Sequence, residues 1–202
     1  MERDQRTARY RLGRRLPQLA SVVTGEFDLR YVARPVCERL AAATGETATF
    51  ELLIGDDIVP IEQATASTSV MSVNWLGRRY PVHCTASGKV FLAYSPEQVR
   101  ERLLSRPLEK VTARTVIDRA FLEAQLAEVR QTGLAHTHEE LELGLDAMAA
   151  PVYGPEGDVV AAVDVSGPSQ RLAGRPELDR LTREAAADLS RRLGYRGRRP
   201  ET

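Results

Sequence analysis

This sequence has few aromatic residues, no closely spaced cysteine pair, no long apolar run and no net charge. Each of these features argues against a class of protein. No stretch approaches the roughly 18 apolar residues of a membrane-spanning helix, and the amino end lacks the apolar run of a secretory signal. Aromatic residues make up only 5% of the chain, which disfavours a surface that stacks nucleic-acid bases. The 28 basic and 28 acidic residues cancel, which argues against a chain that coats a polyanion along its whole length.

Only two cysteines are present, Cys37 and Cys84. They form neither a CxxC motif nor a disulfide framework, which fits a reducing compartment, and we expect a cytoplasmic protein. Cys84, together with His136 and His138, could in principle ligate a metal ion. Because a structural zinc site needs about four ligands and a catalytic one about three, we expect no metal and keep a metal-responsive sensor as an alternative.

Motifs for nucleotide binding and for hydrolysis are also missing. The sequence has no GxGxxG, GxSxG or HExxH, and the Gly-Lys pair at 88–89 lacks the upstream glycine of a phosphate-binding loop. A small hydrolase would have to combine Ser87 and Asp164 with a histidine, and no motif supports that arrangement. The histidines available for it are His83 and His138. We therefore predict a protein that is not an enzyme and needs no cofactor.

The chain has ordinary material for a folded domain, with 43% hydrophobic residues in a regular pattern. Helices are predicted at 16–23, 29–43, 86–94, 97–104, 118–130 and from Pro176 to just before Gly194, and strands at 46–54, 58–64, 69–73, 134–141, 147–153 and 159–166. Pro60 predicts an edge or a bulge in the second strand. This order of elements favours an α+β fold, with a largely antiparallel sheet covered by helices.

Small residues lead directly into the helix predicted at 86–94. Thr85 or Ser87 can cap this helix, and the small side chains leave its first backbone N–H groups open. Because a helix start carries unsatisfied donors and a positive dipole end, it suits a carboxylate or another acceptor. An ordinary capped helix with small residues for packing explains the same pattern.

Asp164 interrupts the apolar strand predicted at 159–166. By alternation, Val160, Ala162, Asp164 and Ser166 face one way, and Val159, Ala161, Val163 and Val165 face the other. An unpaired buried carboxylate is costly, so a polar pocket around Asp164 would have to supply a partner. A solvent-facing position and an ion pair with Arg171 remain equally open.

Several motifs, weak one by one, occur in a characteristic order. They are Tyr10-Arg11-Leu12-Gly13, the run from Tyr80 to Ala93, Gly133 followed by Glu139-Glu140, Leu143-Gly144-Leu145, Ala149-Ala150-Pro151-Val152, and Val165-Ser166-Gly167-Pro168 with Arg171. Together they resemble the effector-binding domain of IclR-type bacterial transcriptional regulators. The resemblance runs from about Tyr10 to Leu193, which is nearly the whole chain.

The resemblance implies a GAF/PAS-like fold, in which a curved, mainly antiparallel sheet flanked by helices carries a small-molecule pocket on one face. It implies an effector that is an organic acid or an aromatic or phenolic metabolite, a homodimer or homotetramer, and contact with DNA only through another domain. The effector's polar head would dock on the backbone amides near 86–88. The implied effector-binding residues are Ala86, Ser87, Gly88, Thr137, His138, Ala147, Asp164 and Ser166.

Two departures from the family pattern stand out. An acid at Asp164 would repel a carboxylate effector unless the side chain were protonated or paired, so a phenolic, amino-bearing or neutral effector, or a cation, is an open option. Only nine residues precede Tyr10, whereas the family carries a winged helix-turn-helix there. We therefore expect 1–9 to be a remnant of an interdomain linker, 10–195 to be the effector-binding and oligomerisation domain, and 196–202 to be a basic tail. An assembly-only domain with a vestigial pocket is the second interpretation.

Overall fold

Period-two alternation of small, β-branched and polar residues produces six strands that form a single sheet. The computed structural model describes residues 2–3, 10–11, 29–66 and 73–197. The strands are β3 (Thr47–Ile54), β4 (Asp57–Thr65), β5 (Tyr80–Pro81), β6 (Ala135–His138), β7 (Leu145–Tyr153) and β8 (Val159–Pro168), in the spatial order β5-β4-β3-β8-β7-β6. Every neighbouring pair is antiparallel. Two short strands, β1 (Glu2–Arg3) and β2 (Tyr10–Arg11), pair separately.

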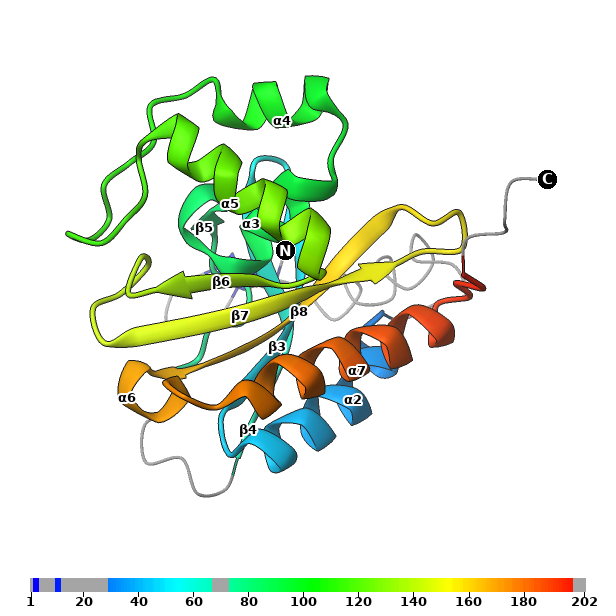
Figure 1. Ribbon diagram of the computed structural model, residues 1–202. Helices are drawn as coiled ribbons and strands as arrows, with labels where there is room; N and C mark the ends of the chain where they lie inside the picture. The colour runs from blue at the N-terminus through cyan, green and yellow to red at the C-terminus, as the bar shows by residue number, and fades with distance from the viewer. Residues whose placement is uncertain (1, 4–9, 12–28, 67–72, 198–202) are drawn as a thin grey trace.

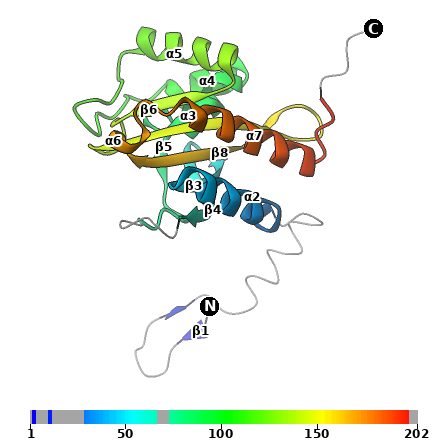
Figure 2. The same cartoon turned by 60° about the horizontal axis from the view of Figure 1, so that its bottom comes forward.

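Helices cover both faces of this sheet, as Figures 1 and 2 show. One face carries α2 (Leu29–Thr44) and α7 (Pro176–Arg192); the other carries the 3-10 helix η1 (Val82–Cys84) and the helices α3 (Ala86–Tyr94), α4 (Glu97–Leu104) and α5 (Arg119–Thr132). A single turn, α6 (Ser169–Leu172), follows β8. The prediction of an α+β fold with a curved, mainly antiparallel sheet flanked by helices is confirmed. No helix among these described segments is long and apolar enough to cross a membrane.

Side chains at the helix ends explain why these helices start and stop where they do. The Thr85 hydroxyl accepts a hydrogen bond from Gly88 N at 3.2 Å, as predicted for the cap of α3. Asp118 accepts one from Phe121 N at 2.8 Å and caps α5. Gly133 ends α5 in the left-handed conformation, with φ of 70°.

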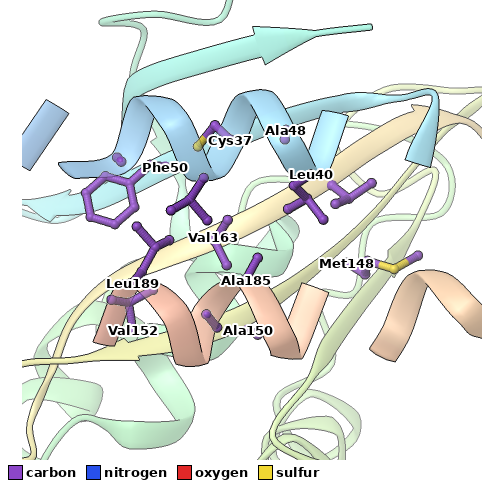
Figure 3. Packing of buried hydrophobic residues seen from close by; sticks show 14 of the residues in the cluster. Cys37, Leu40, Ala48, Phe50, Met148, Ala150, Val152, Val163, Ala185 and Leu189 are labelled. Atoms are coloured by element: carbon purple, nitrogen blue, oxygen red, sulfur yellow. The ribbon is translucent and has the colours of Figure 1, made fainter. Parts of the chain in front are cut away.

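The sheet separates two hydrophobic cores. Phe50, Val163 and Leu189 meet in the core between the sheet, α2 and α7 (Figure 3). Ala162, on the opposite face of β8, packs in the second core beneath α3 and α5. Because side chains alternate along a strand, Asp164 lies on the same face as Ala162, as the sequence predicted. That alternation places the polar residues of β8 on the α3 side of the sheet.

Bulges account for most of the differences in strand detail. Phe50 pairs with Glu62 whereas Glu51 pairs with Pro60, so the predicted irregularity at Pro60 is confirmed. A second register shift, opposite Tyr153, reverses the faces predicted for the first two residues of β8, since Val159 packs in the second core and Val160 in the first.

Other expectations differ in length or lie outside the described residues. The strand predicted at 134–141 ends at His138, because Glu139 adopts a positive φ of 55° and the chain turns away. The short elements β5 and α6 were not predicted. The helix predicted at 16–23 lies outside the described residues. Of the strand predicted at 69–73, only Val73 is described, and it is not in a strand.

Candidate functional site

A cavity lies between the polar face of the sheet and the segment that leads into α3. It holds about 480 Å³ of empty space, the solvent at its mouth included. Its lining comes from all six strands of the sheet, η1, α3 with its cap residue Thr85, and two connecting loops. The lining residues are Thr49, Glu51, Pro60, Trp75, Tyr80, Cys84, Thr85, Ala86, Thr137, Leu141, Leu145, Ala147, Asp164 and Ser166.

Strand register builds the polar floor of the cavity. Asp164 of β8 pairs with Thr49 of β3, and Glu51 follows two residues later on the same face of β3. The two carboxyl groups are therefore diagonal cross-strand neighbours, within reach of each other at a Cα separation of about 7–8 Å. Ser166 pairs with Ala147 of β7, which in turn pairs with Thr137 of β6, and this extends the same row across the sheet.

The part of the lining outside the polar floor is largely aromatic and apolar. The rings of Trp75 and Tyr80 pack edge to face, with centroids 5.7 Å apart. Leu141 and Leu145 line the side near the end of β6, while Ala86 exposes only a methyl group at the start of α3. An apolar body with one polar end fits such a lining, because both carboxyl groups lie on the sheet floor.

Both floor carboxyls hold their protons more tightly than exposed ones do. Burial raises the pKa of Asp164 well above its ordinary value, the charge of Glu51 raises it further, and the Ser166 hydroxyl lowers it. Burial also raises the pKa of Glu51, while its interactions with the Ser87 and Thr49 hydroxyls lower it. The Thr49 hydroxyl donates to Glu51 Oε1 at 2.8 Å. A shared low-dielectric floor therefore disfavours two ionised carboxylates.

Most of the site residues predicted from the sequence lie at this cavity. Ala86, Thr137, Ala147, Asp164 and Ser166 line it. The structure thus places Asp164 in a polar pocket rather than on a solvated face.

Ser87 and Gly88 lie one layer behind the lining. Both are buried in the first turn of α3 and neither lines the cavity. Gly88 packs so closely on η1 that a Cβ there would lie 2.0 Å from Val82 O. Glycine at this position lets α3 approach η1, which positions Ala86 at the cavity.

The expectation that His138 lines the cavity is wrong. His138 is the strand neighbour of Thr137 and so points to the opposite face of the sheet, where its ring lies 3.0 Å from Asp146 Oδ2. Its side chain is 77% exposed. Thr137 takes the cavity position because β6 alternates, and the sequence did not decide which of the two faces inward.

The structure also separates the residues of the alternative metal site. His136 and His138 stack on the outer face of β6 with ring centroids 6.3 Å apart, whereas Cys84 lines the cavity on the other face. No group of three or more histidines, cysteines or acids among the described residues could hold a metal ion. Burial is the main cause that lowers the pKa of His136.

The residues of the alternative hydrolase are not assembled either. The ring of His83 points to the backbone of Glu109, with Nε2 2.9 Å from its carbonyl oxygen.

The ion pair considered between Arg171 and Asp164 does not form. Arg171 binds Glu46 with two hydrogen bonds, of 3.0 and 2.6 Å.

The sequence reasoning missed Glu51, Thr49, Trp75 and Tyr80. A signal for the first two was present, because the alternation of the strand at 46–54 already put Thr47, Thr49 and Glu51 on one face. The pattern did not show which strand pairs with 46–54. Trp75 lies outside regular secondary structure, and Tyr80 belongs to the two-residue strand β5, so no periodicity indicated either of them.

Comparison with known proteins agrees with this architecture. Residues 21–191 match the family described as bacterial transcriptional regulator IclR C-terminal. The chain is 32% identical over 198 residues to the HTH-type transcriptional regulator XynR of Escherichia coli K12, covering 96% of this chain and 79% of XynR. It is 33% identical over 172 residues to the E. coli K12 repressor AllR, covering 84% of this chain and 64% of AllR.

A similar solved structure is an IclR homolog from Microbacterium hydrocarbonoxydans complexed with 4-hydroxybenzoate, with a TM-score of 0.85 and 31% identity. The alignment covers 95% of this chain and 78% of that one. The relatives named here are transcriptional regulators, not enzymes. The chain therefore belongs to the IclR family of bacterial transcriptional regulators and carries their C-terminal effector-binding domain.

Proposed function

We propose that residues 10–195 form a sensor that binds one small organic effector in the cavity beneath α3. Binding is relayed to a winged helix-turn-helix outside this chain. The observation that carries the proposal is the cavity itself, which combines aromatic and apolar side chains with a polar floor built by β3, β8 and β6. A homolog of the same fold has been crystallised with 4-hydroxybenzoate. In this proposal 1–9 belong to the interdomain linker, 196–202 form a basic tail, and the protein acts in the cytoplasm.

Ligand binding would connect parts of the chain that meet at the cavity. The sheet floor, the start of α3 and the segment after β6 each supply part of the lining. An effector that contacts all three favours one arrangement of them, and only such a difference in affinity can shift an equilibrium. A coupling of about 1–3 kcal/mol would change operator affinity about 5- to 150-fold. Homodimers or homotetramers would carry the change to the DNA-binding modules.

The first experiment tests binding. Thermal unfolding of the purified chain is measured against a metabolite panel of keto acids, benzoates, phenols and amines, with zinc and a chelator as separate arms. A specific ligand at a hundredfold excess over its Kd stabilises the folded state by about 2.7 kcal/mol. We expect a saturable shift confined to one chemical class.

A variant that fills the cavity supplies the matched control. Ala147→Leu places a larger side chain on the floor and should abolish the shift, whereas Ala124→Leu, on the exposed face of α5, should preserve it. No shift with any organic compound would favour the assembly-only domain. A shift with zinc alone would favour the metal-responsive sensor.

The relay has its own test. In the full-length regulator, a ligand found above should change the mobility of an operator DNA fragment and the sedimentation coefficient of the free protein at the same ligand concentration. If the ligand binds to the cavity and neither the DNA mobility nor the sedimentation coefficient changes, the proposed relay is wrong.

A further inference from the structure

The floor of the cavity carries two carboxyl groups and no cationic counterpart. None of the described lining residues is a lysine, arginine or histidine. Glu51 and Asp164 are both buried, and no cationic side chain offsets the burial of either one. A carboxylate ligand placed on this floor would bring another negative charge beside two carboxyls whose own ionisation the low-dielectric site already disfavours, which is unfavourable.

Two hydroxyl groups lie near this floor. Ser87 Oγ is buried behind the lining and lowers the pKa of Glu51, and the Tyr80 hydroxyl, which is also buried, interacts with Arg78. Both hydroxyls therefore act on groups of the protein, and the ligand preference of the cavity rests on the two carboxyls.

The aromatic part of the lining, at the β5 edge of the sheet, suits an organic cation. Trp75 and Tyr80 both line the cavity, and the faces of aromatic rings attract ammonium and guanidinium groups. Leu141 and Leu145 offer apolar contact for the body of such a ligand. The aromatic rings and the two carboxyls of the lining therefore both favour a positively charged ligand.

We propose that this cavity selects a small organic cation, an amine or amidine on an apolar body of about one ring, and discriminates against carboxylates. The inference rests on the proposed function, because it names the ligand class of the same site. Nitrogen-bound hydrogens of the ligand donate to the carboxyl oxygens of Asp164 and Glu51. The positive charge of the ligand favours the ionised form of the two carboxyls, so a proton that either of them carries passes to solvent as the cation binds.

The pH dependence of binding follows from this exchange. Besides the two acids, the titratable lining residues are Tyr80 of β5 and Cys84 of η1. Burial raises the pKa of the Cys84 thiol to about 12 and raises the pKa of Tyr80 as well. The charged groups that act on these two are Glu140, Lys89 and Glu109 for Cys84, and Arg78, Glu51 and Glu142 for Tyr80. Affinity for a cation should therefore rise with pH as Glu51 and Asp164 ionise.

The test uses two series of three compounds with nearly the same shape, each with an anion, a neutral amide and a cation. The aromatic series is benzoate, benzamide and benzamidine, and the aliphatic series is butyrate, butyramide and butylamine. Isothermal titration with the full chain is run at pH 6 and pH 8. We expect the cation of each series to bind at least about tenfold more tightly than the anion, which is about 1.4 kcal/mol. Its affinity should be higher at pH 8, with proton release seen as a dependence of the binding heat on the buffer.

Charge-neutral variants identify the residues responsible. Asp164→Asn and Glu51→Gln should each remove most of the preference for the cation and should raise the affinity for the amide. Asp158→Asn and Glu97→Gln, which neutralise exposed acids, should leave the preference unchanged.

The outcomes separate this inference from the proposed function. Preferential or equal binding of the anions would overturn the inference and leave the sensor proposal standing. Binding of none of the six compounds at millimolar concentration would also overturn it, and the sensor proposal would then depend on the wider metabolite panel. A cation preference that survives both charge-neutral variants would reject the floor carboxyls as its cause.

Discussion

Lys89 Nζ lies 2.5 Å from Glu140 Oε1 in the interior of the protein, with both side chains almost fully buried. The pair joins α3, whose first residue lines the cavity, to the segment that follows β6. The Thr115 hydroxyl donates to the Glu140 carbonyl at 2.7 Å, which adds the loop before α5 to the same cluster. Two walls of the cavity are therefore fixed to each other by one buried ion pair.

Replacing one partner of this pair should be strongly destabilising. Lys89→Met leaves the Glu140 carboxylate buried without its counter-charge, and we expect a loss of about 3–5 kcal/mol in the free energy of unfolding. Urea denaturation followed by circular dichroism measures it. The double variant Lys89→Met with Glu140→Leu should recover most of the loss, since it leaves no charge behind. If the double variant is as unstable as the single one, packing and not charge explains the effect.

Neutralising Asp164 should stabilise the folded protein at neutral pH. Because burial raises the pKa of Asp164 in the folded state, its stabilising contribution is complete below its ordinary pKa of 3.8 and is lost as the pH rises through the raised value. Asp164→Asn does not suffer this loss. Its melting temperature should exceed that of the wild type by at least about 2–4 °C at pH 8, the shift that 1 kcal/mol produces in a domain of this size.

The pH series supplies the control for Asp164→Asn. At pH 4 the wild-type carboxyl is already protonated in the folded state, so the two melting temperatures should nearly coincide. Glu51→Gln should follow the same trend. Combining the two variants should give less than the sum of their effects, since removing one charge relieves the other group. A difference that does not change with pH would contradict the raised pKa.

Adding one methyl group at Gly88 should disturb both stability and the cavity. The new Cβ would lie 2.0 Å from the backbone oxygen of Val82, so α3 and η1 would have to separate. We expect Gly88→Ala to cost about 3 kcal/mol, the upper range for overpacked cores, and to weaken any ligand of the cavity. Gly55→Ala is the comparison, because nothing lies within 4 Å of its Cβ and only backbone strain of about 1 kcal/mol applies. Equal losses for Gly88→Ala and Gly55→Ala would show that α3 moves away from η1 without an additional cost in the free energy of unfolding.

The ion pair of Glu46 and Arg171 should matter more than a surface pair. The Glu46 side chain is buried and receives two hydrogen bonds from Arg171, while the nearest nitrogen of Arg175 lies 3.9 Å away. Arg171→Met should cost about 1–3 kcal/mol, because the carboxylate loses its main partner. Arg180→Met, which removes an exposed i,i+4 pair with Glu184, should cost at most about 0.5 kcal/mol. Thermal unfolding at low and high salt compares them, and a similar loss for both would place Glu46 effectively in solvent.

Local patterns determined the elements and the faces that they bury. Thr85, Asp118 and Gly133 mark helix ends through short-range hydrogen bonds and backbone conformation. The structure has the two starts within one residue of their predicted positions and the end of α5 within two. Alternation likewise assigned Asp164 and Ser166 to one face of their strand, since neighbouring side chains must point in opposite directions. These features depend on residues a few positions apart, which is why the sequence alone determined them.

Tertiary structure decided which strands became neighbours. Only the pairing of β3 with β8 puts Glu51 beside Asp164 and turns one acidic residue into a carboxyl pair on a cavity floor. The partner of Arg171 was likewise decided across a separation of 125 residues, where Glu46 and not Asp164 lies within reach. Strand order depends on how helices cover the two faces of the sheet and on long-range packing of the cores. A local sequence pattern does not indicate this order. The sequence therefore determined which faces of the strands are polar, and the fold determined that two carboxyl groups lie side by side on the cavity floor.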